Sequence, residues 1–165
     1  MNPIAPTNIT FVASSKNASL YRGDPSFIYR CENLGLALSN IGHKVNYLHI
    51  SEFSTKIKQN IVVFHRPLAT ISLWNTLRKL RRMGVVAVAE FDDLIFDKSY
   101  AKYSPGVLNN LVSMRVTRRR FKSHQLASSW FDAICVSTQP LAEHAKRLFP
   151  KKQIHVIHNS VHNSW

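Results

Sequence analysis

Acidic residues are scarce in this chain. Its 165 residues hold nine Asp and Glu against 22 Lys and Arg, which gives a formal net charge of +13. So large an excess of positive charge favours a negatively charged partner. The candidate partners are nucleic acid, anionic lipid headgroups and a phosphorylated small molecule.

Cysteines and long apolar runs are also few. The two cysteines, Cys31 and Cys135, lie in apolar segments, which favours free buried thiols in an intracellular protein over a disulfide framework. No apolar run approaches the roughly 18 residues that a membrane span needs, and the N-terminus lacks the pattern of a signal peptide. We therefore expect a cytoplasmic, single-domain protein that buries about 70% of its unfolded surface.

Several motifs that carry chemistry are missing. The chain has no GxGxxG, no GxxxxGK[ST], no GxSxG and no Cys and His spacing typical of zinc. Asp92, Asp93 and Asp97 form a DDxxxD pattern, but such a metal site needs a helix, and the residues before it are strand-like. The sequence therefore predicts no metal and no bound cofactor.

Strands and helices alternate along the whole chain. The periodicity predicts a Rossmann-like α/β fold, in which a parallel sheet of about six strands has helices on both faces. We expect one domain over residues 1–160. Predicted strands cover 8–13, 44–50, 60–65, 84–89, 131–137 and 154–158, and predicted helices cover 26–41, 68–83, 105–129 and 138–149.

The acidic residues that are present cluster after the fourth predicted strand. Glu90, Asp92, Asp93 and Asp97 fall at its carboxyl end, where parallel α/β sheets bind ligands. Neighbouring strand residues point to opposite faces, and two carboxylates about 4 Å apart repel by roughly 4 kcal/mol. One of Asp92 and Asp93 should therefore pair with a cation or accept hydrogen bonds from backbone N–H groups, which leaves the other freer to act as a catalytic base with a raised pKa. The alternative is that both cap the following turn.

Basic residues and one glycine make up the candidate binding set. Gly23 precedes the first helix, where backbone N–H groups bind phosphate, although a plain turn explains it as well. His65 and Arg66 end the third strand, and His65 is either catalytic or structural. Arg118 lies on the apolar side of the predicted helix 105–129, so it is expected to face the sheet or the cleft. The full set predicted to bind acceptor or phosphate is Arg22, Gly23, Arg30, His65, Arg66 and Arg118.

An ordered series of segments resembles a known family. The series is Tyr29-Arg30, LALSNIGHKV at 36–45, VVFHR at 62–66, EFDDLIF at 90–96, FDAICVSTQPLAEHAK at 131–146 and HVIHNSV at 155–161. Together these segments, which span nearly the whole chain, resemble the N-terminal half of GT-B glycosyltransferases of the group-4 type.

The resemblance implies an acceptor-binding domain. Its partners would be a C-terminal domain that binds a nucleotide-sugar donor and a glycan or lipid-linked acceptor, and no metal is usually needed. Asp92 would stand where many relatives carry a cleft histidine, Gly23 would approach the donor phosphates, and residues 161–165 would begin the linker to the second domain. Relatives often have a Gly-Gly pair where only Gly23 stands, and a glycine where this chain has Ser160.

The basic helices also match docking on an anionic inner leaflet, as in a peripheral membrane enzyme. Without the donor-binding half, the domain is expected to bind the acceptor but not to catalyse sugar transfer. Two other functions remain open: a nucleic-acid-binding module and a non-catalytic scaffold. Because the aromatic residues are not interleaved with the basic runs, the sequence predicts no specific nucleic-acid partner.

Overall fold

The computed structural model describes residues 5–14, 17–56 and 58–159. The predicted linker at 161–165 lies outside them.

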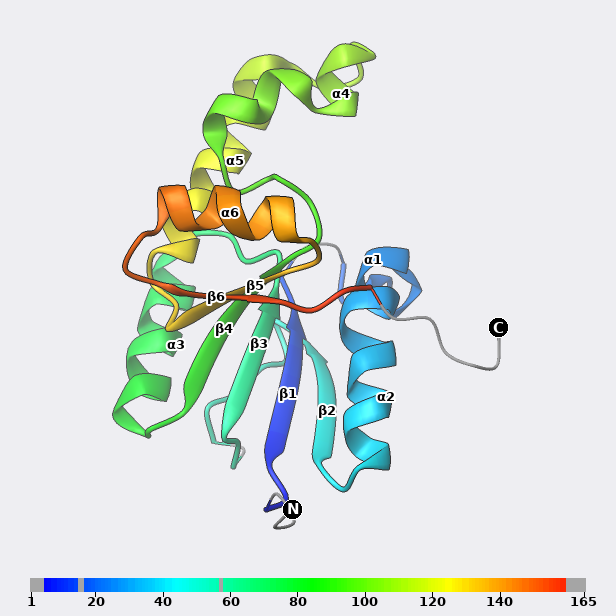
Figure 1. Ribbon diagram of the computed structural model, residues 1–165, viewed down its shortest axis with the longest axis vertical. Coiled ribbons are helices and arrows are strands. Elements are labelled where there is room, and N and C mark those ends of the chain that lie inside the picture. The colour runs from blue at the N-terminus through cyan, green and yellow to red at the C-terminus, as the bar shows by residue number, and fades with distance from the viewer. Residues whose placement is uncertain (1–4, 15–16, 57, 160–165) are drawn as a thin grey trace.

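A single sheet of six parallel strands forms the centre of the protein (Figure 1). The strand order is β2-β1-β3-β4-β5-β6, and every neighbouring pair is parallel. The predicted Rossmann-like α/β class is therefore correct. The strands are β1 (Asn8–Ala13), β2 (Lys44–His49), β3 (Ile61–His65), β4 (Val86–Phe91), β5 (Ala133–Val136) and β6 (Gln153–Val156).

The two faces of the sheet bury separate clusters of apolar residues. Phe11 of β1 packs with Phe27 and Cys31, whereas the adjacent Val12 packs with the larger cluster around Phe64 on the other face. This alternation follows from the two-residue period of a strand. The sheet is thus covered on both sides, which explains why its strands read as nearly continuous apolar runs.

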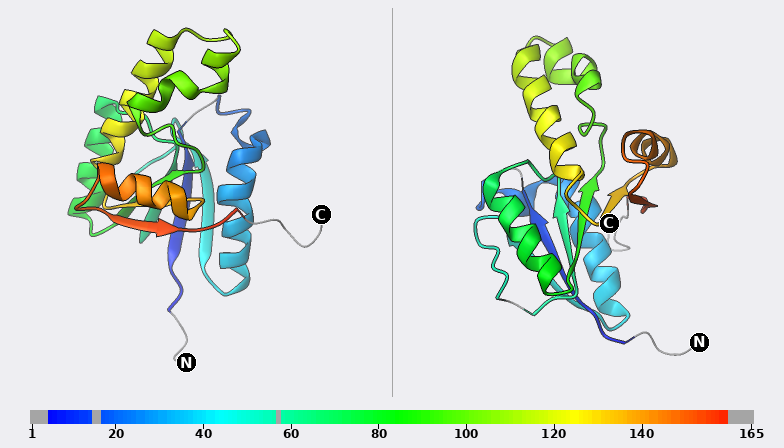
Figure 2. Two further views of the ribbon diagram at one scale, coloured as in Figure 1. Left: turned by 45° about the horizontal axis from the view of Figure 1, so that its top comes forward. Right: turned by 90° about the vertical axis from the view of Figure 1, so that its left-hand side faces the viewer.

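Helices cover both faces, as expected (Figure 2). A helical run over residues 25–40 covers one face, and the leucines of α3 and the alanines of α5 and α6 cover the other. Gly42 and Gly84 follow α2 and α3 with φ of 97° and 71°, values that favour glycine at a helix end. The helices of these two layers are α1 (Pro25–Phe27), α2 (Asn33–Asn40), α3 (Ile71–Arg82), α5 (Met114–Ser128) and α6 (Gln139–Leu148).

The first helical run is interrupted by a π-helical turn, which the sequence did not predict. Short 3-10 turn η1 (Tyr21–Gly23) leads into α1, and the π-turn η2 (Ile28–Glu32) joins α1 to α2. The wider turn directs both Arg30 and Cys31 into the protein, where they are 2% and 0% exposed. The run ends at Asn40, one residue before the predicted end of the helix, and the following Ile41 is 69% exposed.

The predicted helix 105–129 is wrong, because two helices occupy it. α4 (Pro105–Leu108) ends early, Asn110 takes a left-handed φ of 55°, and the Ser113 side chain accepts a hydrogen bond from the Val116 N–H at the start of α5. With the 3-10 segment η3 (Lys98–Tyr103), α4 and the first half of α5 form a projection above the sheet (Figure 1). We call residues 98–122 the arm.

The arm and the carboxyl ends of the strands lie at the same end of the molecule, opposite the start of β1 (Figures 1 and 2). The topology therefore places any ligand bound at the sheet edge next to the arm. Within the described residues, no helix combines the length and the apolar character needed to span a bilayer.

Candidate functional site

The carboxyl ends of β3 and β4 bring the predicted acidic and basic residues together. His65 ends β3 and stands beside Glu90 of β4 in the parallel register. Arg66 follows His65 directly, and Asp92 and Asp93 follow the last residue of β4, Phe91. The five residues therefore meet at one edge of the sheet because the two strands run in the same direction and end together.

A continuous set of polar contacts starts inside the protein at Arg30. Its Nε donates to Glu90 Oε1 at 2.5 Å, and a ring nitrogen of His65, Nδ1, meets Glu90 Oε2. The other ring nitrogen lies 3.0 Å from Ser26 Oγ, and Ser26 donates to Asp92 Oδ2 at 2.6 Å. Arg30, His65 and Glu90 are at most 2% exposed. We call these five residues together with Arg66 the buried relay.

The Ser26 hydroxyl joins the two halves of the buried relay. Because it donates to Asp92, its oxygen is left to accept from His65 Nε2. Arg30 pairs with Glu90, and Arg66 pairs with both Asp92 and Asp93. Each of these three carboxylates therefore has a cationic neighbour.

Arg66 holds the two aspartates in place. Its backbone takes a left-handed φ of 49°, which is uncommon for any residue other than glycine and is found at functional sites. The guanidinium donates from Nε to Asp92 Oδ1 and from Nη2 to Asp92 Oδ2, both at 2.8 Å. It also donates to Asp93 Oδ2 at 2.8 Å. One side chain thus orients both carboxylates.

The two aspartates differ in their proton affinity. Burial opposes ionisation of Asp92, but the hydrogen bond from Ser26 and the charge of Arg66 outweigh it, so the pKa of Asp92 is lowered. Partial burial and the nearby charge of Asp92 raise the pKa of Asp93. The side chains of Asp92 and Asp93 are 15% and 63% exposed. Asp93 is therefore the better proton acceptor, and Asp92 is the better structural anchor.

The sequence predicted that only one of the two aspartates would be held by a cation or by backbone N–H groups, whereas Arg66 donates to both. The two residues were expected to alternate across a strand, yet β4 ends at Phe91 and both lie in the following loop. Their environments differ because of their contacts and not because of the alternation of side chains along a strand: only Asp92 accepts a hydrogen bond from Ser26. Asp97 points elsewhere, since it accepts hydrogen bonds from Ser99 and from His144 of α6.

A pocket of about 490 Å³ opens beside Asp93, between the sheet edge and the arm. Its lining residues include Arg66, Asp93, Tyr100, Tyr103, Val112, Val116, Arg120 and His124. Such a concave site with a mainly apolar lining and few polar groups is typical of ligand pockets.

His124 contributes a neutral imidazole to this pocket. Burial lowers its pKa to about 4, and its Nδ1–H donates to the Pro67 carbonyl at 2.7 Å. This bond fixes the tautomer, so the lone pair of the ring is on Nε2. The residue is 1% exposed, so the ring forms part of the buried wall of a pocket that also holds two arginines.

Three predicted binding residues lie away from the pocket. Arg22 pairs with Glu32 at 2.5 Å and stacks over Tyr47. Gly23 uses its N–H in a turn to the Leu20 carbonyl, and its φ is not in the left-handed region, so the predicted phosphate contact has no free donor at that residue. Arg118 is exposed and lines a separate groove on the outer side of α5.

Arg30 also differs from its predicted role. Its guanidinium bonds Glu90, the Ile157 carbonyl and Asn159 Oδ1, and it contacts Cys135 Sγ at 3.8 Å. These contacts connect the residues after β6 to the helical run over residues 25–40. Arg30 therefore positions Glu90 and the segment after β6, and it does not face the pocket.

Sequence reasoning missed Ser26 and His124. Ser26 had a signal, because a serine after Asp-Pro is typical of a helix start, yet its contacts with Asp92 and His65 join residues 66 and 39 positions apart. His124 lies within a basic run of α5, and nothing in that run distinguishes it from a solvent-exposed residue. Both assignments depend on the tertiary structure.

One group of residues within the described part of the chain has metal-ligand chemistry. Ligand atoms of Cys31, His65 and Glu90 lie within 4.8 Å of one another. Burial raises the pKa of Cys31 well above its usual value, so the thiol stays protonated, and the guanidinium of Arg30 already neutralises Glu90. A metal ion at this position would have to displace the proton of the Cys31 thiol and the guanidinium of Arg30, so these residues do not fit a metal site.

No protein-family model matches the chain, and no curated protein matches it.

Proposed function

We propose that this domain binds the acceptor in glycosyl transfer from a nucleotide-sugar, and that Asp93 is its catalytic base. The observation that carries the proposal is the pocket beside Asp93, where an exposed carboxyl with a raised pKa is held by Arg66 at the carboxyl edge of a parallel sheet. The ordered sequence resemblance to GT-B N-terminal domains supports it independently.

The geometry gives each group a distinct part in such a reaction. The Asp93 carboxylate takes the proton from an acceptor hydroxyl while the hydroxyl oxygen forms its bond to the sugar, and the nucleoside diphosphate leaves with the bonding electron pair. Arg66 orients Asp93 but also lowers its basicity, and Asp92 offsets this by its own negative charge. Asp92, held by Ser26 and Arg66, is a positioning residue.

The pocket lining indicates a sugar-bearing, negatively charged acceptor. Tyr100 and Tyr103, with ring centroids 5.7 Å apart, offer apolar faces for a sugar ring. The guanidinium of Arg120 offers several N–H donors for a phosphate or carboxylate. In this proposal, a separate donor-binding domain supplies the nucleotide-sugar site, so the acceptor domain alone binds acceptor but does not transfer sugar.

Binding is tested first, by saturation-transfer NMR of this chain with alkyl glycosides and alkyl glycoside phosphates. We expect signals from the sugar protons, stronger for the phosphates. Tyr103→Ala and Arg120→Ala should weaken them, and Arg118→Ala is the matched control because Arg118 lies outside the pocket. The absence of a saturation-transfer signal for every probe, or an equal loss of signal in the Arg118→Ala variant, would contradict the assignment of the pocket.

Catalysis is tested with the donor-binding domain present, by release of nucleoside diphosphate from a panel of nucleotide-sugars. Asp93→Asn should lower kcat by about 10² to 10⁴, the usual share of a general base, with little change in the acceptor KM. Asp92→Asn should lower kcat by a smaller factor. Full activity in both variants would support the alternative of a non-catalytic scaffold.

A further inference from the structure

The arm carries a concentration of charge that the rest of the chain does not balance. Residues 98–122 contain seven Lys and Arg and no acidic residue. In the part of the chain that the structure describes, no ion pair joins any of these seven to a carboxylate. The seven are Lys98, Lys102, Arg115, Arg118, Arg119, Arg120 and Lys122.

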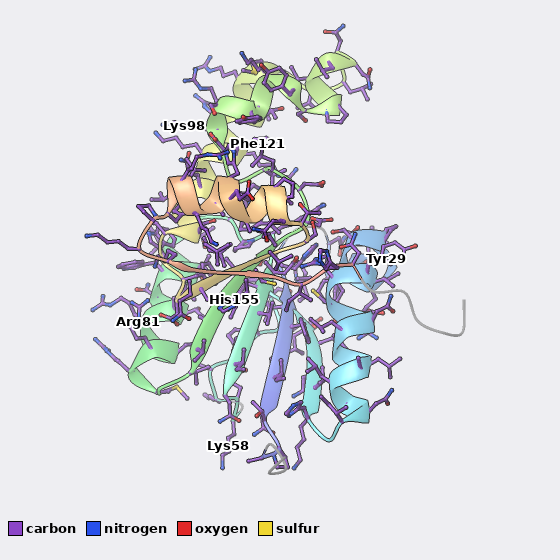
Figure 3. The ribbon with its side chains drawn as sticks, in the orientation of Figure 1. Tyr29, Lys58, Arg81, Lys98, Phe121 and His155 are labelled. Atoms are coloured by element: carbon purple, nitrogen blue, oxygen red, sulfur yellow. The ribbon has the colours of Figure 1, made fainter. Side chains whose placement is uncertain are left out.

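Five of these cations share one groove. It has a volume of about 550 Å³ and is lined by Lys98 of η3 and by Arg115, Arg118, Arg119 and Lys122 of α5, with Met114 as its apolar member. Figure 3 labels Lys98 where the arm joins the body. Like charges at spacings of three and four residues on a helix repel one another, so this arrangement favours an anion in the groove.

The arm also exposes large apolar side chains at its far end. Leu108 and Leu111 are 63% and 79% exposed, and Val112, Met114 and Val116 are 39% to 56% exposed. They come from α4, the connection to α5 and the first turn of α5, and we call these five residues the apolar tip. Met114 of the tip also lines the basic groove. Apolar side chains beside a basic face are characteristic of segments that lie in a membrane interface.

We propose that the arm docks the protein on a bilayer rich in anionic lipid. The groove of Lys98, Arg115, Arg118, Arg119 and Lys122 binds lipid phosphates, and Leu108, Leu111 and Val112 enter the headgroup region. A nucleic acid would account for the groove but would leave the apolar tip in water. A second copy of this chain would cover the tip only by bringing two sets of seven cations together.

The proposal explains why the arm and the pocket are adjacent. Val112 and Val116 of the tip also line the pocket that ends at Asp93. If the proposed function holds, docking would bring the headgroup of a lipid-linked acceptor to the pocket, with its chain still in the bilayer. Docking itself does not depend on sugar transfer, so it is tested with this chain alone.

Co-sedimentation with vesicles of phosphatidylcholine, with and without phosphatidylglycerol, measures docking. We expect binding to the phosphatidylglycerol vesicles only. The double variant Arg115→Glu with Arg119→Glu should lower the partition coefficient at least about tenfold, since each cation near the surface adds attraction. The matched control is Arg78→Glu with Arg82→Glu, which changes the net charge equally on α3. Equal losses in both double variants would show a general charge effect and overturn the proposal.

Insertion of the tip is tested with a polarity-sensitive dye on Leu111→Cys. The native thiols are buried, and burial raises the pKa of Cys135 to about 11, so they should not compete for the label. Ile71→Cys, at an 82% exposed apolar position on α3, is the control. A blue shift on phosphatidylglycerol vesicles at 111 and none at 71 is expected. No shift at 111, or tighter binding to a defined DNA or RNA at physiological salt than to vesicles, would overturn the proposal.

Discussion

The buried relay and the arm differ in whether their charged side chains are paired. In the relay, each charged group has a partner of opposite charge within hydrogen-bonding distance, and three of its residues are almost fully buried. In the arm, seven positive charges project into solvent beside exposed leucines. Mutual pairing fixes the geometry of a site, whereas unpaired charge is available to a partner. Under the two proposals above, the relay would serve chemistry and the arm would serve docking.

Removing the charge of Glu90 should break the relay most strongly. Glu90→Gln keeps the shape of the side chain but leaves Arg30 buried and unpaired, which should lower the free energy of unfolding by about 3–5 kcal/mol. Urea denaturation measures the effect, and Glu143→Gln on the exposed face of α6 is the control. Adding Arg30→Gln should cost less than the sum of the two single changes. A loss below about 1 kcal/mol would mean that the pair is not formed.

The relay could be predicted only in part. The sequence located His65, Arg66, Asp92 and Asp93 correctly at one edge, because parallel strands end together and apolar runs mark where each strand ends. It did not predict that Arg30 would meet Glu90, since these residues are 60 positions apart and the π-turn that directs Arg30 inward has no clear local signal. The fold follows from short-range periodicity, whereas the pairing depends on long-range packing.

The arm was the less predictable region. A continuous helix over 105–129 would have turned Arg118 toward the sheet, but the buried side of α5 is centred on Thr117, Phe121 and His124. Arg118 points away from this side, into the basic groove. Sequence periodicity was misleading here because the apolar residues at 107, 111 and 114 are exposed or only partly buried, so they do not mark the core face.

The relay should also give stability a specific pH dependence. The folded pKa of Asp92 is lowered from its usual 3.8, so its ionic contacts stabilise the fold above that pH and are lost as the pH falls through the folded value. Asp92→Asn should cost about 2 kcal/mol at pH 7, as expected for a hydrogen-bonded charge. The cost should shrink toward acid pH, where the native carboxyl is protonated.

Thermal unfolding of both proteins between neutral pH and about pH 3 measures this difference. Asp97 also has a lowered pKa, from its hydrogen bonds with Ser99 and His144, so the variant should retain part of its acid sensitivity. A cost that is the same at all pH values would show that Asp92 contributes through packing and not through its charge.

The arm should respond to charge removal in the opposite direction, and by the smallest amount. Arg119→Ala breaks no described ion pair and relieves repulsion from Arg115 and Lys122, so the free energy of unfolding should stay the same or rise by at most about 0.5 kcal/mol. Added phosphate should raise the Tm of the native protein more than that of the variant, because an anion that binds only the folded groove stabilises it. Sodium chloride at equal ionic strength is the control, since simple screening would affect both salts alike. If Arg119→Ala instead destabilised the protein as much as a change in the relay, the cations of the arm would be paired within the fold, and the contrast between the two regions would fail.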